Sequence, residues 1–409
     1  MSQQPVLLPY ADPAFVADPF PLYRQLREDG PVRRAILAGG IEAWVVTRYE
    51  DGLSALSHPQ LSSDARDASD PRLLERLPAT DRGSMLHTML RTNPPDHTRL
   101  RRLVSQAFTA HHVAGLEPRI QEIADRLLDE IVPAGRADLV ESFALPLPVT
   151  VISELLGVAV TDRHDFQRWA DDLILQGAEL PDRARLDRAW QQMSAYLAGL
   201  LETKRAHPGD DLLSALIVAR DEERRLDEDE LISMAFLLLV AGYITTVNLI
   251  GSGIAALLAH PGQLRKLRDD PALLPGAIEE FLRYDGPVNP GIARFAREDV
   301  TIAGVDIPRG ATVLVASAIA DRDPEYFPDP DRLDITRRDN AHLAFGHGIH
   351  YCLGAPLARL EGRIAIATVL RRLRRLALAV PPEELRWRPG GLRGPEHLPV
   401  TFTAGASDR

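Results

Sequence analysis

Residues 231–259 contain no Asp, Glu, Lys or Arg, and this apolar run constrains the fold more than any other segment. A helix of about 20 apolar residues is long enough to span a membrane. This run, however, includes polar side chains at Ser233, Thr245, Thr246, Asn248 and Ser252. Such groups are costly in lipid but inexpensive in a protein interior that supplies hydrogen-bond partners. We therefore expect a long helix through the centre of a globular protein and no membrane span.

Helical periodicity dominates the rest of the chain, and strand patterns are short. The strongest helical patterns cover residues 100–108, 120–131, 189–204, 231–258, 274–284 and 355–376. The clearest strands are expected at residues 42–47, 300–302 and 312–315, with a small β-rich part at about residues 30–60. No Gly/Ser-rich linker, repeat or low-complexity run divides the chain. The pattern predicts a mainly α fold with small β-sheets in a single domain over residues 1–409.

Charge and the N-terminal sequence narrow the range of partners and locations. The formal net charge is −11, which argues against nucleic acid as a partner. The chain does not start with a basic region followed by an apolar stretch, so no secretory signal is visible. We expect a soluble, cytoplasmic protein.

Cys352 is the only cysteine, so neither an internal disulfide nor a multi-cysteine zinc site is available. It lies in the string Phe345-Gly346-His347-Gly348-Ile349-His350-Tyr351-Cys352-Leu353-Gly354. The glycines allow backbone to approach a flat or bulky group and leave amide N–H groups free to point at the sulfur. A lone thiolate bonded by backbone amides suits an axial haem ligand. The alternative for an isolated cysteine is a buried structural thiol.

This string resembles the haem-binding loop of the cytochrome P450 family, and the resemblance extends from Asp18-Pro19-Phe20 to Leu398-Pro399-Val400. The chain looks most similar to soluble actinobacterial members that tailor polyketides. The resemblance implies the cytochrome P450 fold, a haem b cofactor and Cys352 as the iron ligand. It also implies a monomeric monooxygenase that uses O2 to hydroxylate or epoxidise a small lipophilic substrate.

The apolar run contains Ala241-Gly242-Tyr243-Ile244-Thr245-Thr246. A mid-helix glycine and threonines that bond back to the preceding turn can open a groove, or they can simply pack. In the family this position holds A-G-x-acid-T-T, so Thr245, with Thr246 beside it, is the implied oxygen-handling threonine. Ile244 replaces the acid and cannot carry a proton. Several alternatives are open: water and Thr245 deliver the protons, the enzyme uses peroxide, or its chemistry is dehydrogenation or oxidative coupling. A non-catalytic haem protein is a further alternative.

Two sets of residues are implied to support the haem. Glu280 and Arg283 lie three apart on one helix face. The family's E-x-x-R motif implies that they form a buried network with Arg332, which holds the cysteine loop. Haem propionates need cationic or N–H donors. The matching positions are His97, Arg101, Arg294, His342 and His350, alongside Phe345, Gly346 and Gly354 of the loop.

By the same resemblance, the substrate chamber is apolar. Its expected lining is Leu86, Met89, Leu173, Leu237, Val240, Ala241, Val288, Ile292 and Leu392, with Gln176, Asn289 and Arg393 as candidate polar anchors. Each anchor could equally be a loop residue that faces solvent.

Arginines gather near the cysteine loop in an otherwise acidic chain: Arg359, Arg363, Arg371, Arg372, Arg374 and Arg375 follow it, and Arg99, Arg101 and Arg102 lie on an earlier helix. They predict a docking face for an acidic electron donor, although most charge runs are only solvated helix faces. A [2Fe–2S] centre would need several cysteines, so we expect electrons to come from a separate ferredoxin and its reductase.

Overall fold

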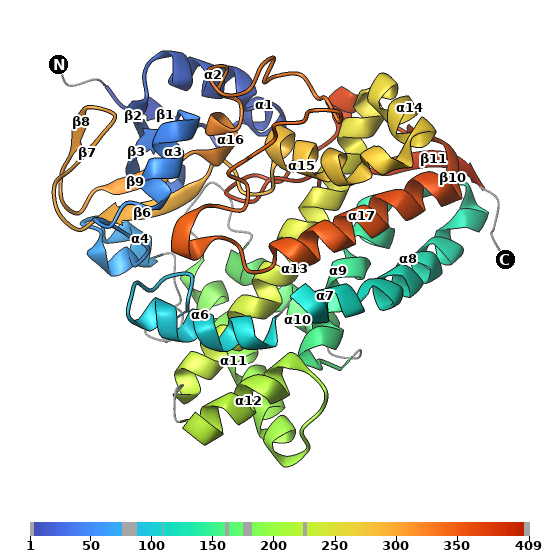
Figure 1. Cartoon of the computed structure of the whole chain (residues 1–409), viewed down its shortest axis with the longest axis horizontal. Coiled ribbons are helices and arrows are strands. Elements are labelled where there is room, and N and C mark those ends of the chain that lie inside the picture. The colour runs from blue at the N-terminus through green and yellow to red at the C-terminus, as the bar shows by residue number, and fades with distance from the viewer. Residues whose placement is uncertain are drawn as a thin grey trace.

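A computed structural model of the chain describes residues 4–75, 88–108, 110–159, 163–174, 182–223 and 227–404. Helices form most of the body (Figure 1). They are α1 (Pro13–Ala17), α2 (Phe20–Glu28), α3 (Tyr49–Leu56), α4 (Arg72–Glu75), α6 (Asp96–Ala107), α7 (Ala110–Gly115), α8 (Glu117–Ile131), α9 (Pro146–Leu156), α10 (Arg163–Ile174), α11 (Arg183–Ala206), α12 (Leu212–Glu223), α13 (Glu228–Ala259), α14 (Pro261–Asp269), α15 (Leu274–Asp285), α16 (Ser317–Ala320) and α17 (Ala355–Arg372).

The strands form small sheets beside this helical body. They are β1 (Val6–Leu7), β2 (Val32–Ile36), β3 (Glu42–Val46), β4 (Leu61–Ser62), β5 (Arg136–Asp138), β6 (Ile292–Ala296), β7 (Val300–Ile302), β8 (Val305–Ile307), β9 (Thr312–Val315), β10 (Leu373–Leu378) and β11 (Pro399–Ala404). The largest sheet has the order β1-β2-β3-β9-β6-β4. Strand β3 pairs in parallel with β9, so this sheet joins the early and late parts of the chain. The predicted mainly α class with small sheets is confirmed.

The uncharged run is α13, which passes through the middle of the helical body (Figure 1). The helix begins at Asp227, whose side chain forms a capping box with Glu230. It packs against α9, α11, α15 and α17, and 78% of its most apolar window is buried. The prediction of a core helix is therefore confirmed.

One expected boundary was wrong, and one strand was missed. The helical pattern expected to reach residue 376 ends at Arg372, and β10 starts at Leu373 and pairs with β11. Leu373 and Leu376 are both buried, and their spacing of three residues is also typical of a helix face. Long-range pairing with β11 makes this segment a strand instead. The sequence also missed β8, which pairs with β7 around a turn.

Candidate functional site

The loop that carries Cys352 lies directly before α17 and is shaped by two left-handed glycines. Gly346 and Gly348 have φ angles of 69° and 70°, which disfavour any side chain. The Cys352 N–H donates to the Phe345 carbonyl at 2.9 Å, and the backbone N–H groups of Gly354 and Ala355 hydrogen-bond the sulfur. Burial raises the pKa of the Cys352 thiol, and these two amides and Arg101 oppose that rise. The expected amide cradle around the sulfur is present.

Four of the expected propionate donors gather beside this loop. His97 and Arg101 project from α6, Arg294 from β6, and His350 from the cysteine loop. The rings of His97 and His350 are 4.2 Å apart between centroids, and Ser63 Oγ lies 2.9 Å from His350 Nε2. Burial, followed by the charges of Arg294, His97 and Arg101, lowers the pKa of His350 to about 3. The cluster is thus an enclosed and strongly electropositive site.

This cluster fits the two carboxylates of a haem. The Arg294 side chain is buried and donates only to the neighbouring Ala293 carbonyl among the described residues, and desolvation lowers its pKa to about 10. Within the described part of the chain, His97 Nε2 is buried and has no hydrogen-bond partner. Uncompensated buried cations are costly, and an anionic ligand removes that cost. Cys352 would hold the iron while this cluster binds the propionates.

His342 lies elsewhere, so its assignment as a propionate donor was wrong. Its Nδ1 accepts the Ala344 N–H at 3.2 Å, and its Nε2–H donates to Glu279 at 3.2 Å. Arg359 holds the same Glu279 at 2.7 and 2.8 Å and stacks over the Phe345 ring at 4.6 Å. Burial opposes ionisation of Glu279, but Arg359 and His342 together lower its pKa to about 2. These residues brace the cysteine loop from outside the haem cluster, a role for which the sequence offered no motif.

The network around Glu280 exists, but its third arginine is Arg337. Glu280 and Arg283 are fully buried and share two bonds of 2.7 and 2.9 Å. Arg337 Nε donates to Glu280 at 3.2 Å. Arg332, the expected member, points outward to Asp334, and its side chain is 60% exposed. Only the Arg332 carbonyl joins the network, by accepting from Arg283 at 3.3 Å.

The network is connected to the cysteine loop through Asp321. Arg283 donates to the carbonyls of Asp321 and Pro330 at 2.9 and 2.8 Å. The Asp321 carboxylate in turn accepts the Leu343 N–H at 2.7 Å, just before the loop begins. These bonds hold the segment that precedes Phe345.

One face of α13 presents an open stripe within an otherwise buried helix. Leu237, Ala241 and Thr245, spaced four apart, retain accessible surface, whereas Ile244 and Thr246 are 1% and 3% exposed. Thr245 Oγ1 donates to the Ala241 carbonyl at 3.1 Å. A Cβ added to Gly242 would lie 2.7 Å from Ile152 of α9, so this glycine also permits close helix packing. Only Thr245 of the two threonines reaches the open face.

The other expected chamber residues divide into three groups. Val288 and Leu392 are paired by an antiparallel bridge, and Ile292 approaches Gly346 of the cysteine loop. Met89, Leu173 and Val240 are buried within the large core cluster. Leu86 and Gln176 lie outside the described residues.

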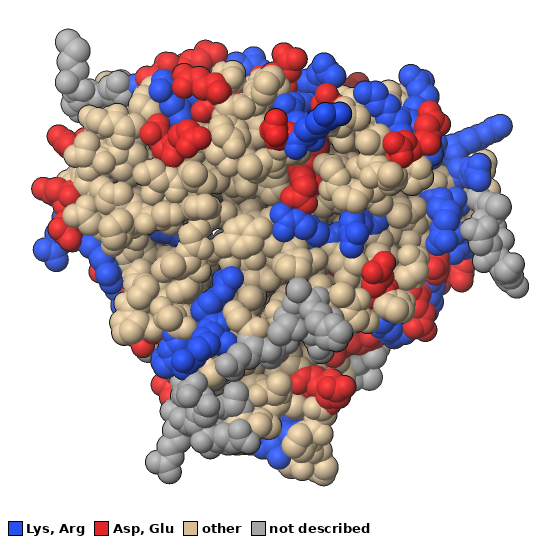
Figure 2. Space-filling model, in the orientation of Figure 1, with Lys and Arg blue, Asp and Glu red and all other residues tan. Residues whose placement is uncertain are grey.

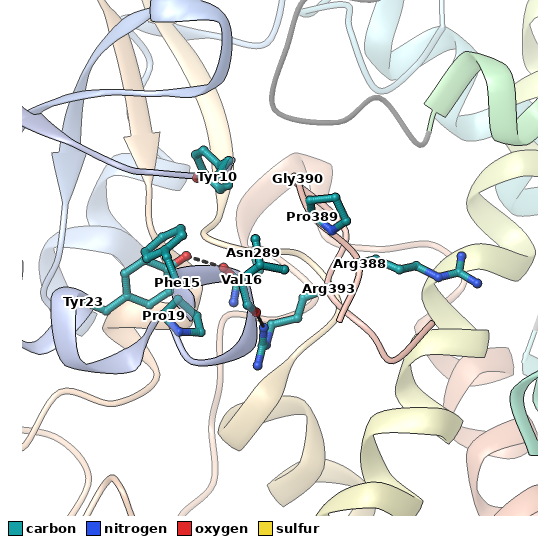
Figure 3. Close-up of a pocket in the computed structure, with 10 residues that line it drawn as sticks. All are labelled: Tyr10, Phe15, Val16, Pro19, Tyr23, Asn289, Arg388, Pro389, Gly390 and Arg393. Atoms are coloured by element: carbon teal, nitrogen blue, oxygen red, sulfur yellow. Dashed lines mark hydrogen bonds between the residues drawn. The ribbon is translucent and has the colours of Figure 1, made fainter. Parts of the chain in front are cut away.

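The two described candidate anchors are structural residues, so their assignment to the substrate was wrong. Figure 3 shows that Asn289 accepts a hydrogen bond from the Tyr23 hydroxyl and that Arg393 donates to the Val16 carbonyl. Arg393 also pairs with Asp285 at 2.8 Å. Both residues line a small pocket beside α1 and α2 and tie the N-terminal segment to the loop at 388–393. Tyr23 and Val16, which they bind, lie far away in the sequence, so the sequence alone does not reveal these contacts.

Known proteins resemble this chain in both sequence and architecture. The cytochrome P450 family profile matches residues 39–396. The cytochrome P450 monooxygenase PikC of Streptomyces venezuelae is 50% identical, over 96% of this chain and 92% of PikC. The mycinamicin IV hydroxylase/epoxidase of Micromonospora griseorubida is 44% identical, over 93% of this chain and 94% of its own length.

A solved structure extends the likeness to three dimensions. The myxobacterial cytochrome P450 CYP267B1, solved in complex with myristic acid, superposes with a TM-score of 0.90 and 43% identity. The match covers 95% of this chain and 98% of that one. Together with the cysteine loop, the cation cluster and the threonine stripe, these likenesses place the chain in the cytochrome P450 family, as a monooxygenase that binds haem b through a cysteine thiolate.

Proposed function

We propose that this P450 hydroxylates or epoxidises a lipophilic secondary metabolite of the polyketide or macrolide type. The main support is that the structure combines the Cys352 loop and its cation cluster with the open stripe of Leu237, Ala241 and Thr245 on α13. The relatives PikC and the mycinamicin IV hydroxylase/epoxidase support the reaction class. The apolar residues Leu237, Val288 and Leu392 support a lipophilic substrate.

Each part of the site has a defined task in this proposal. Haem bound through Cys352 would supply the activation of dioxygen and the transfer of one oxygen atom. The amides of Gly354 and Ala355 stabilise negative charge on the sulfur, and Arg101, Arg294, His97 and His350 would hold the propionates. Thr245 keeps a hydroxyl proton on Oγ1, bonded to the Ala241 carbonyl, at the open face. The apolar stripe excludes bulk water and orients the target carbon.

We infer that electrons arrive from a ferredoxin at the face that carries α6 and α17. Figure 2 shows basic side chains in several groups on this face, with acidic groups between them. Several of the expected docking arginines are neutralised there: Arg359 pairs with Glu279, Arg371 and Arg372 with Asp125, and Arg99 with Glu230. Arg102 and Arg363 form no ion pair with any described residue. These two cations are the best candidates to meet an acidic partner.

The test compares turnover driven by ferredoxin, its reductase and NAD(P)H with turnover driven by hydrogen peroxide alone. The substrate is selected from lipophilic natural products by the haem spin-state shift. Reversing both charges, with Arg102→Glu and Arg363→Glu, is expected to lower the ferredoxin-driven rate about tenfold and leave the peroxide-driven rate unchanged. Arg168→Glu, at an exposed arginine of α10, is the matched control. Equal loss of both rates would contradict docking at this face, and peroxide-only turnover would favour the peroxide-driven alternative.

Ile244→Glu is expected to raise the fraction of NAD(P)H consumption that ends in product. Ile244 is 1% exposed and adjoins Thr245, so a carboxyl group there adds a proton donor at the point where the chain has none. Burying that group is expected to cost about 1–3 kcal/mol of stability. Product and released peroxide are measured per NAD(P)H, with Ile244→Gln as the size-matched control. If Ile244→Gln also raises the fraction of NAD(P)H that ends in product, the shape of the side chain at residue 244, and not proton transfer, limits coupling in the wild type.

We also infer that the chain is one P450 domain over residues 1–409, and a soluble cytoplasmic monomer. Support for the single domain comes from the parallel pairing of β3 with β9, which joins distant parts of the chain in one sheet.

A further inference from the structure

A turn directly before α6 presents an arginine that lacks a partner. The turn is closed by the Arg91 N–H, which donates to the Thr88 carbonyl at 3.0 Å, and by Thr92 Oγ1, which donates to the same carbonyl at 3.1 Å. The Arg91 guanidinium makes no hydrogen bond or ion pair with any described residue. Protein surrounds it closely enough for desolvation to lower its pKa. The residue nevertheless keeps accessible surface, so a ligand can reach it.

Among the described residues, the charge that acts on Arg91 is already engaged elsewhere. That charge is Asp64, and both of its carboxylate oxygens accept from Arg66 at distances of 2.5 to 2.9 Å. Asp64 also sits at the start of a short turn that its side chain caps. Arg91 is thus a half-buried cation without a counter-ion of its own among the described residues, and a bound anion would offset the cost of its desolvation.

Arg91 also differs from the arginines that act on the haem-binding histidines. The charges that act on His350 are Arg294, His97 and Arg101, and those that act on His97 are Arg101 and Arg294. Arg91 is not among the charges that lower the pKa of either histidine. A haem has two propionates, and Arg101 and Arg294 already match them in charge. Arg91 is a third enclosed guanidinium for which the haem has no third carboxylate.

The same turn contributes another unused donor. Thr88 Oγ1 is buried and has no hydrogen-bond partner within the described part of the chain. Between Thr88 and Arg91 lies Met89, which packs into the large core cluster shared with α13. The turn therefore combines polar donors with an apolar neighbour, as a site for the charged end of a lipophilic molecule requires.

We propose that Arg91 binds a carboxylate on the substrate, so that this P450 oxidises a lipophilic carboxylic acid. The inference rests on the proposed function and narrows its substrate class. Arginine suits this task because its planar fork of donors matches the two oxygens of a carboxylate.

The test uses a pair of iron-coordinating probes that differ only in charge: imidazolyl-dodecanoic acid and dodecylimidazole. Each is titrated into the holoenzyme and followed by the shift of the haem Soret band. We expect the acid to bind about tenfold or more tightly than the neutral probe, the range for one charge-assisted hydrogen-bonded contact. Arg91→Gln is expected to remove this preference without weakening dodecylimidazole, and Arg91→Lys to restore part of it. Arg297→Gln, a surface arginine paired with Asp67, is the control.

Each outcome separates the alternatives. An acid preference that survives in Arg91→Gln, or that is absent from the wild type, would overturn the proposal. Reduced haem retention in Arg91→Gln with the preference intact would assign Arg91 to a haem propionate instead. Dodecylimidazole reports on the haem and the chamber without involving a carboxylate. If it binds normally and neutral lipophiles are oxidised, the proposed monooxygenase function is supported and only the assignment of an acidic substrate is refuted. Failure of both probes on the wild type would contradict both.

Discussion

Glu280→Gln is expected to lower the free energy of unfolding by about 3–5 kcal/mol, because it leaves the Arg283 guanidinium buried without its charge partner. Both side chains are fully buried in the native state. The carboxylate also accepts from the Asp334 N–H at 2.8 Å and from Asn340 Nδ2 at 3.2 Å. Its loss disturbs the whole segment before the cysteine loop, so haem retention should fall as well. Urea unfolding of the holoenzyme, with the slope checked for constancy, measures the change.

Two arginine variants provide the matched comparison. Arg337→Met removes a guanidinium that is 10% exposed and bonded to Glu280, so it should also be clearly destabilising. Arg332→Met alters a side chain that is 60% exposed and should change stability by no more than about 0.5 kcal/mol. Equal destabilisation by the two substitutions would refute the assignment of Arg337 as the network arginine.

Cys352→Ser is expected to abolish monooxygenase activity and to remove the red-shifted band of the reduced carbon monoxide complex. A serine hydroxyl is not ionised near neutral pH and cannot replace thiolate donation to iron. The fold should persist, because the loop is held by Arg283, Asp321 and the left-handed glycines rather than by the sulfur. The carbon monoxide difference spectrum and far-UV circular dichroism measure the two effects.

The neighbouring Tyr351→Phe serves as the control for that experiment. Tyr351 is 39% exposed, and its hydroxyl only receives a 3.3 Å contact from Arg359. This variant should keep both the red-shifted band and turnover. Persistence of the band in Cys352→Ser would refute the iron-ligand assignment.

Local patterns predicted the helical elements well and failed where distant segments compete. The predicted segments at 231–258 and 274–284 match α13 and α15 to within a few residues, because apolar spacing and end caps are local properties. The end of α17 was misplaced because β11, which pairs with β10, lies beyond residue 398.

Site residues show the same division. Cys352 and Thr245 could be found from the sequence because each lies in a short motif whose geometry is set by its own glycines or helical spacing. Asn289, Arg393, His342 and Arg332 were misassigned because polar side chains have several possible partners. Asn289 hydrogen-bonds to Tyr23, and His342 to Glu279, and the two residues of each pair are far apart in the sequence.

Residue type and spacing within a few turns of chain were enough to predict the mainly helical class, the buried central helix and the glycine-framed cysteine loop. The resemblance to the family's A-G-x-acid-T-T motif identified Ile244 as the position that lacks an acid. Long-range packing was needed to show which arginine completes the Glu280 network, which histidines meet Arg294, and that Arg91 has no partner among the described residues. This is because a long charged side chain can reach several possible partners. Which of them it meets depends on how segments distant in the sequence pack around it.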